Sequence, residues 1–156
     1  NRRKGPEMAE LDFKVTVRGI CARDTRYPQE AYTFVREALD FTVKALNRPA
    51  GNQPRHVTGP ELLDGIREYA IHEFGPMAST VFKSWGIGKT EDFGEIVFNL
   101  VESGILGKTE TDKKEDFSNG YDFFNAFVKP FLPASEEPQI KTRRKPPSAK
   151  RRRKKQ

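Results

Sequence analysis

Side chains that could bind phosphate are concentrated at the two ends of this chain. The segment KTRRKPPSAKRRRKKQ (residues 141–156) contains ten Lys or Arg and no acidic residue, and NRRK (residues 1–4) adds three more basic residues. Each phosphate that such side chains neutralise releases counterions, which gives strong binding that does not depend on base sequence. The predicted nucleic-acid-binding residues are Arg2, Arg3, Lys4, Lys141, Arg143, Arg144, Lys145, Lys150, Arg151, Arg152, Arg153, Lys154 and Lys155.

The rest of the chain carries the opposite charge. Residues 5–140 contain 15 Lys or Arg against 22 Asp or Glu, a net charge of −7, although the whole chain of 156 residues has a net charge of +6. We interpret the chain as an acidic globular body with basic ends. A charge asymmetry of this kind indicates a tail that binds nucleic acid or an anionic surface.

Two other uses of the basic C-terminal segment have to be compared with nucleic-acid binding. Binding to an anionic membrane surface usually needs a lipid or apolar anchor beside the charges, and this segment has none. A nuclear-import signal has the same composition and stays open as an alternative.

Catalytic and metal-binding patterns have little support in the sequence. His56 and His72 are 16 residues apart and Cys21 is remote from both, so no zinc-site spacing is present. The stretch WGIGKT (residues 85–90) lacks the first glycine of a phosphate-binding loop, because Lys83 stands at that position. Asp64 and Glu68 lie one helical turn apart, as surface charges often do. We expect no cofactor, no metal and no enzymatic activity.

The composition also bears on the compartment. A single cysteine excludes an internal disulfide and suits a reducing cytosol. No apolar run approaches the roughly 20 residues of a membrane span. The N-terminal stretch NRRKGPEMAEL lacks the apolar region of a secretory signal. We therefore expect a cytoplasmic protein with no membrane partner.

Helical periodicity of apolar residues dominates the body. The predicted helices cover residues 11–21, 28–45, 58–74, 77–85 and 90–103. Thr58 and Glu61 in TGPE have the spacing of a capping box, and Thr90 is the predicted N-cap of the last helix. The stretch ILGKTETDKKEDFSNGYDFF (residues 105–124) then predicts a β-hairpin.

This order of elements resembles a winged helix-turn-helix over residues 60–124. We therefore predict a mainly α fold: one compact helical domain (residues 9–133) with a winged helix-turn-helix-like half. A basic N-terminal extension (residues 1–8) and an extended basic C-terminal tail (residues 134–156) flank this domain.

The predicted recognition helix has the wrong charge for reading DNA. Its outer face presents acidic and amide side chains where a DNA-reading helix presents basic ones. These side chains are Glu91, Asp92, Glu95, Asn99 and Glu102. We interpret this face as solvated or protein-contacting. The aromatic segment YDFFNAFVKPF (residues 121–131) could stack bases, but its helical spacing favours packing in the core.

Several stretches together resemble a small bacterial family, the signature protein of the Planctomycetes–Verrucomicrobia–Chlamydiae superphylum. They are MAELDF (8–13), RYPQEAYTFVREALDFT (26–42), RHVTGPELLDGIREYAIHEFGPMASTVFKSWGI (55–87), TEDFGEIVFNLVESGIL (90–106) and DFSNGYDFFNAF (116–127). The resemblance covers residues 8–127 in order and leaves out the basic ends. It implies a bacterial cytosolic housekeeping protein with non-specific nucleic-acid binding, and it assigns no catalytic residue.

We expect RNA to be the preferred ligand, as in an rRNA-binding ribosomal or ribosome-associated protein. Extended tails rich in Lys, Arg and Pro suit the dense phosphates between rRNA helices, and ribosomal proteins would contact the acidic body. One alternative is a nucleoid-type protein that binds DNA without sequence specificity through its winged domain. Another is a protein-interaction adaptor or an enzyme whose tail only localises it.

Overall fold

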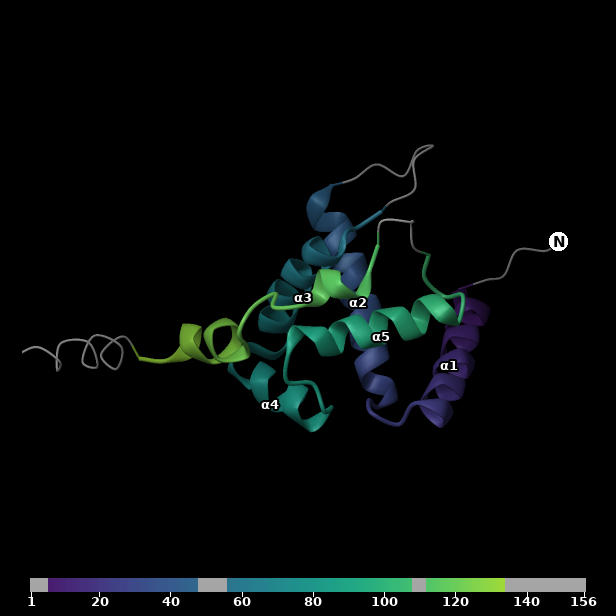
Figure 1. The fold of residues 1–156 in the computed structure, drawn as a ribbon, viewed down its shortest axis with the longest axis horizontal. Helices are drawn as coiled ribbons and strands as arrows, with labels where there is room; N and C mark the ends of the chain where they lie inside the picture. The colour runs from purple at the N-terminus through teal and green to yellow at the C-terminus, as the bar shows by residue number, and fades with distance from the viewer. Residues whose placement is uncertain (1–5, 48–55, 108–111, 134–156) are drawn as a thin grey trace, which may run out of the picture.

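The computed structural model describes residues 6–47, 56–107 and 112–133 (Figure 1). The α-helices in these ranges are α1 (Pro6–Arg23), α2 (Gln29–Leu46), α3 (Gly59–Phe74), α4 (Ala78–Ser84) and α5 (Thr90–Glu102). A 3₁₀ turn, Gly75–Met77, joins α3 to α4. The predicted mainly α architecture is confirmed, because each predicted helix occurs and the described ranges contain no strand.

The start of α3 is set by the local sequence. Thr58 Oγ1 accepts a hydrogen bond from the backbone N–H of Glu61 (3.2 Å), and Glu61 Oε1 accepts one from the N–H of Thr58 (3.0 Å). This reciprocal pair is the predicted capping box, and it satisfies two backbone donors that the first helical turn leaves open. Gly75, with φ +54°, ends the helix in a conformation that other residues rarely adopt.

The start of α5 differs from the prediction. Lys89, not Thr90, occupies the N-cap position, and its N–H donates to Asp92 Oδ2 (3.2 Å). Thr90 is buried, and its hydroxyl donates to the backbone carbonyl of Phe117 (2.6 Å) and accepts from the N–H of Gly120 (3.0 Å). Thr90 therefore anchors a distant segment instead of capping its own helix.

The predicted β-hairpin was wrong for the part of residues 105–124 that the structure describes. A 3₁₀ turn, Lys114–Phe117, stands where the second half of the hairpin was expected. The reason is that the first turn of α5 already binds the backbone here: Thr90 holds Phe117 and Gly120, and Glu91 Oε2 accepts from the N–H of Asn119 (3.2 Å). These backbone groups are therefore already bound and are not available to pair with a strand. The winged helix-turn-helix resemblance thus has no support in the described residues.

Aromatic side chains fill the core around Phe82 of α4. The rings of Phe34, Phe93 and Phe127 lie with centroids 5.4, 5.3 and 5.1 Å from that of Phe82. Phe127 belongs to a π-helical turn (Phe124–Val128) that precedes a 3₁₀ turn (Lys129–Phe131), and it is fully buried. The prediction that the aromatic segment packs in the core is confirmed for Phe127, whereas Phe124 is 52 % exposed.

Helices α2 and α3 pack directly against each other. A Cβ atom at Gly65 of α3 would overlap the hydroxyl of Thr42 of α2. Thr42 is buried, and its hydroxyl donates to the carbonyl of Ala38 (2.7 Å). The absence of a side chain at Gly65 therefore lets the two backbones approach each other and sets the frame on which α4 and α5 pack.

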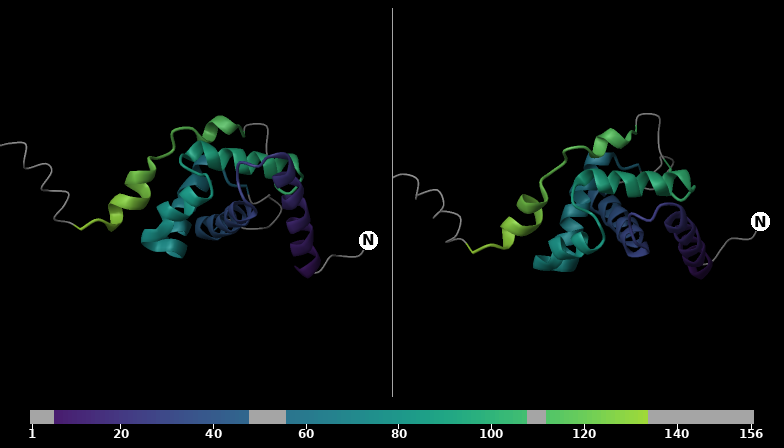
Figure 2. Two further views of the ribbon diagram at one scale, coloured as in Figure 1. Left: turned by 90° about the horizontal axis from the view of Figure 1, so that it is seen from below. Right: turned by 60° about the horizontal axis from the view of Figure 1, so that its bottom comes forward.

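The ends of the described chain lie far apart in the molecule. Helix α1, which begins at Pro6, lies at one end of the long axis, and the segment that stops at Pro133 lies at the other (Figures 1 and 2). No helix within the described ranges combines the length and the apolar character that crossing a bilayer requires.

Candidate functional site

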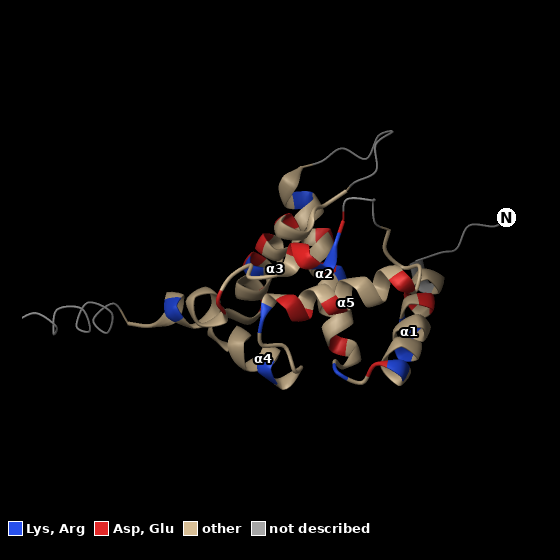
Figure 3. Cartoon of the chain, viewed as in Figure 1, with Lys and Arg blue, Asp and Glu red and all other residues tan. Residues whose placement is uncertain are grey.

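The thirteen residues predicted to bind nucleic acid all lie outside the described residues. What the structure describes is the body that carries them. This body contains 12 Lys or Arg against 19 Asp or Glu in the described ranges, a net charge of −7. Figure 3 shows acidic residues spread over α2, α3 and α5, whereas basic residues mark the lower ends of α1 and α4.

The acidic face of α5 was predicted to be solvated or protein-contacting, and the structure gives it a different role. Asp92 Oδ2 accepts from the backbone N–H of Gly88 (2.8 Å) and of Lys89, while its Oδ1 accepts from the hydroxyl of Tyr27 (2.6 Å). Tyr27 is only 3 % exposed. One carboxylate thus caps α5 and also fastens the turn between α1 and α2 to it.

The environment of Tyr27 keeps its hydroxyl protonated. Burial raises the pKa of the Tyr27 phenol, and the adjacent carboxylate of Asp92 raises this pKa further. A neutral phenol donates a hydrogen bond to a carboxylate, whereas a phenolate would repel it. The Tyr27 hydroxyl therefore remains a hydrogen-bond donor to Asp92 at neutral pH.

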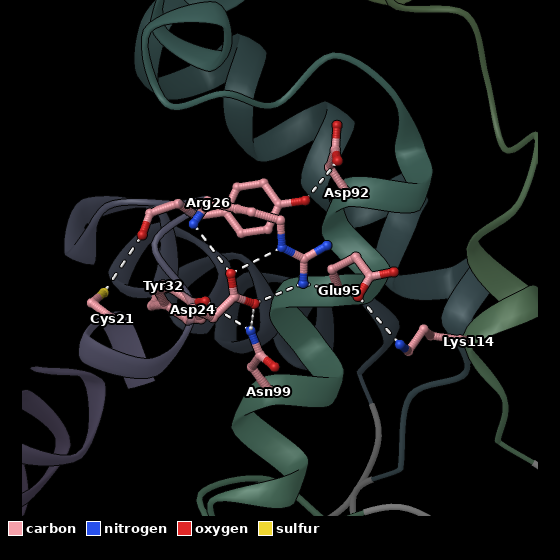
Figure 4. Close-up of polar contacts among 9 residues, drawn as sticks. Cys21, Asp24, Arg26, Tyr32, Asp92, Glu95, Asn99 and Lys114 are labelled. Carbon is pink, nitrogen blue, oxygen red and sulfur yellow. Dashed lines mark hydrogen bonds and ion pairs between the residues drawn. The ribbon is translucent and has the colours of Figure 1, made fainter. Parts of the chain in front are cut away.

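A second polar group on α5 extends this junction (Figure 4). Glu95 Oε1 lies 3.2 Å from Arg26 Nη2 and 3.2 Å from Lys114 Nζ. Arg26 also pairs with Asp24, donating from Nε to Oδ1 (2.9 Å) and from Nη2 to Oδ2 (2.7 Å). Glu95 therefore connects the α1–α2 turn with the 3₁₀ turn that follows α5.

Asn99 closes the network from the next turn of α5. Its Nδ2 donates to Asp24 Oδ2 (3.0 Å) and to the hydroxyl oxygen of Tyr32 (3.0 Å). The hydrogen bonds from Arg26 and Asn99 hold the pKa of the Asp24 carboxyl well below its usual range. Asp24 thus remains a carboxylate under ordinary conditions, and it aligns both partners.

These contacts decide what α5 can do chemically. Glu91, Asp92, Glu95 and Asn99 all bind groups of their own chain, and of the predicted outer face only Glu102 lacks a partner in the described residues. A helix in the major groove needs free donor side chains facing base edges. The face is a structural junction, so the interpretation as solvated or protein-contacting was wrong for most of it, and it offers no base-reading groups.

The backbone N–H groups of Gly88 and Lys89 in the WGIGKT stretch do not point at a free phosphate position. In a phosphate-binding loop the backbone N–H groups point at the ligand. Here the N–H groups of Gly88 and Lys89 are both taken by the carboxylate of Asp92. A negative charge already occupies the position of the phosphate, which agrees with the missing first glycine.

An apolar pocket lies between the end of α2, the start of α3 and the end of α5. It encloses about 270 Å³, and its walls include Leu39, Leu62, Val97 and Val101. The pair of His56 Nε2 and Asp112 Oδ1, 3.4 Å apart, stands at its polar side. The pocket shares no lining residue with the Tyr27–Asp92 junction.

Metal-binding geometry does not occur in the part of the chain that the structure describes, where no three His, Cys, Asp or Glu side chains are grouped for an ion. His72 lies 3.4 Å from Glu73 on the exposed side of α3.

Cys21 is half-buried and its thiol points at the carbonyl of Tyr27 (3.5 Å). Burial, with Asp24 and Glu30 nearby, raises the pKa of this thiol. A thiol with a raised pKa is a poor nucleophile.

The sequence interpretation missed the importance of Asp24, Arg26 and Tyr27, which it treated only as a break between two helices. One local signal was available: Asp24 Oδ1 accepts from the backbone N–H of Arg26 (3.1 Å), two residues later. Aspartate commonly forms a turn of this kind. The partners on α5 lie 65 to 75 residues further along the chain, where no local pattern indicates them.

Searches of protein-family models, of curated proteins and of solved structures found no match to this chain.

Proposed function

We propose that this protein is a non-catalytic nucleic-acid-binding protein, with rRNA as its preferred ligand and a ribosomal or ribosome-associated role. The observation that carries the proposal is the charge division. Residues 141–156 hold ten basic and no acidic residues, whereas the described body has a net charge of −7. Because of this charge division, we assign polyanion binding to the termini and other contacts to the body.

The surface of the body supports different binding roles for the body and for the termini. Asp64 and Glu68 of α3 are exposed and have no hydrogen-bond or ion-pair partner in the described ranges. Such a surface repels a long phosphate backbone but suits contact with basic proteins. A ribonucleoprotein offers both phosphate and basic protein surface, which naked DNA does not. Membership of the superphylum signature family belongs to the same proposal.

A nucleoid-type DNA-binding protein is less well supported. That alternative depends on a wing and a recognition helix. The described residues contain no hairpin, and the outer face of α5 is occupied by contacts with Arg26, Tyr27 and Lys114.

Sedimentation of cell lysates in a sucrose gradient tests the proposal. We expect the full chain to move with ribosomal particles at moderate salt and a chain truncated after Gln139 to stay at the top. A full-length variant with the ten Lys and Arg of 141–156 changed to Gln should behave like the truncation, because charge and not length binds phosphate. If the full chain stays at the top, the ribosomal assignment is wrong. If the truncated chain still moves with the particles, the tail is not the anchor.

A further inference from the structure

A broad, open groove lies on the body where the end of α1 and the α1–α2 turn meet the end of α4. It has a volume of about 850 Å³, and its walls include Arg26, Pro28, Lys83 and Trp85. The two walls touch at Gly86, where an added Cβ would lie 3.0 Å from the backbone carbonyl oxygen of Arg26. The groove is thus built between two segments that the core holds in fixed positions.

Two cationic groups at this groove have unused capacity. Lys83 is exposed, and its ammonium group has no hydrogen-bond or ion-pair partner in the described ranges. The side chain of Arg26 is 52 % exposed; its Nε and Nη2 bind Asp24 and Glu95, whereas its Nη1 has no acceptor in those ranges. Lys83 carries the unpaired positive charge of the groove, whereas Arg26, whose charge is balanced by Asp24 and Glu95, adds a hydrogen-bond donor for a phosphate oxygen.

An aromatic ring stands beside these cations. Trp85 is partly exposed at the groove, and its ring makes tilted or edge-on contacts with Phe34, Phe74 and Phe82, with centroid distances of 5.8, 6.0 and 6.0 Å. Its indole N–H has no acceptor in the described ranges. A partly exposed ring that three core rings hold in place is a rigid group against which a base can pack.

The groove also contains one acidic side chain, Glu30. A carboxylate repels phosphate, but it accepts hydrogen bonds from the exocyclic amine of a base. The cation suits the phosphate of a nucleotide, the aromatic ring suits the face of its base, and the carboxylate suits an exocyclic amine. The groove therefore fits a nucleotide better than it fits a bare anion. A duplex fits poorly, because its bases are stacked inside and the body of net charge −7 repels its two backbones.

We propose that this groove binds one unpaired nucleotide of an RNA strand, with its base against Trp85 and its phosphate bound by Lys83 and Arg26. The inference rests on the proposed function for its class of ligand. It adds a contact on the body that is separate from the basic termini, and this contact selects unpaired RNA.

The sequence offers a direct probe, because Trp85 is the only tryptophan of the chain. We would titrate the full chain with a ten-nucleotide oligoadenylate while following tryptophan fluorescence excited at about 295 nm. Total binding would be followed separately by the anisotropy of a labelled copy of the same oligonucleotide. We expect saturable quenching by the single strand and little quenching by a duplex of equal length, although the termini bind both.

Two variants with the same charge change isolate the groove. Lys83→Glu removes its free cation, whereas Lys44→Glu alters an exposed lysine near the other end of α2, roughly 22 Å along the helix from Gln29 at about 1.5 Å per residue. We expect Lys83→Glu to raise the oligonucleotide concentration for half-maximal quenching at least threefold above that of Lys44→Glu. Far-ultraviolet circular dichroism would check that both variants are folded.

The outcomes separate the two proposals. If anisotropy reports binding but tryptophan fluorescence does not change, or if both variants quench alike, the groove does not bind RNA. Equal quenching by the duplex would overturn the selection for unpaired RNA. If anisotropy reports no binding at all, the proposed function itself fails, and this inference fails with it.

Discussion

Two acidic helix faces in this molecule have similar composition and opposite roles. On α3, Asp64 and Glu68 are exposed and have no hydrogen-bond or ion-pair partner in the described ranges. On α5, Asp92 and Glu95 bind Tyr27, Arg26 and Lys114. The difference comes from what the fold brings opposite each face. Acidic residues on a helix surface are therefore not a single class, and their energetic importance depends on partners that are remote in sequence.

The largest expected contrast between the two faces comes from removing one carboxylate from each. Asp92→Ala removes two hydrogen bonds from the backbone N–H groups of Gly88 and Lys89, worth about 0.5–1.5 kcal/mol each, and leaves the buried hydroxyl of Tyr27 unpaired at about 1–3 kcal/mol. We expect a loss of about 2–4 kcal/mol in the free energy of unfolding, measured with urea. Asp64→Ala on α3 should change that free energy by less than about 0.5 kcal/mol. Equal losses of unfolding free energy in Asp92→Ala and Asp64→Ala would show that the two faces contribute equally to stability.

A double-mutant cycle separates the two contributions of Asp92 to stability. In a Tyr27→Phe background the unpaired hydroxyl is absent, so Asp92→Ala should cost only the loss of the cap. The difference between the two backgrounds measures the Tyr27–Asp92 bond alone. A difference near zero would mean that the capping of α5 accounts for the whole effect.

An intermediate effect is expected at Thr90, the buried residue at the start of α5. Thr90→Val keeps the shape of the side chain but removes the hydroxyl that binds Phe117 and Gly120. We expect a loss of about 1–3 kcal/mol in the free energy of unfolding, and faster amide hydrogen exchange at Gly120. Thr90→Ser retains the hydroxyl and should keep the slow exchange at Gly120. Unchanged exchange in Thr90→Val would contradict the anchoring role.

The effect expected for Asp24→Asn is recognised by its pH dependence, because the mutation removes the stability that the carboxylate contributes at neutral pH. The folded pKa of Asp24 is depressed by Arg26 and Asn99, while an unfolded aspartate titrates near about 3.9. Stability from this group is therefore fully present above about pH 4, and it is lost as the pH falls through that value toward the folded pKa. Between pH 5 and 2 the stability of Asp24→Asn should fall less steeply than that of the unmodified chain. Parallel curves would contradict this.

Local patterns in the sequence predicted the helices well. The capping box of Thr58 and Glu61 needs only residues three positions apart, and apolar stripes such as Phe93 to Val101 need only helical spacing. Such interactions are local, so their pattern can be read without knowledge of the fold.

The failures share one physical cause, which is competition from distant partners. Thr90 has the right type for an N-cap, but Phe117 and Gly120 bind its hydroxyl and Asp92 takes over the capping. The hairpin failed because side chains of α5 bind backbone groups that a strand would need. The predicted binding residues at the termini lie outside the described residues, so they stay a prediction.

The separation of Pro6 and Pro133 along the long axis has a consequence for any partner of the two basic termini. The helical body lies between the two attachment points as a spacer (Figure 1). Arg2–Lys4 leads into α1 at one end, whereas the C-terminal segment continues from Pro133 at the other. Two basic segments attached side by side would compete for neighbouring phosphates of one strand. If both termini bind polyanion as proposed, their attachment at opposite ends favours a bridge between two separate polyanion segments over contact with neighbouring phosphates of one strand.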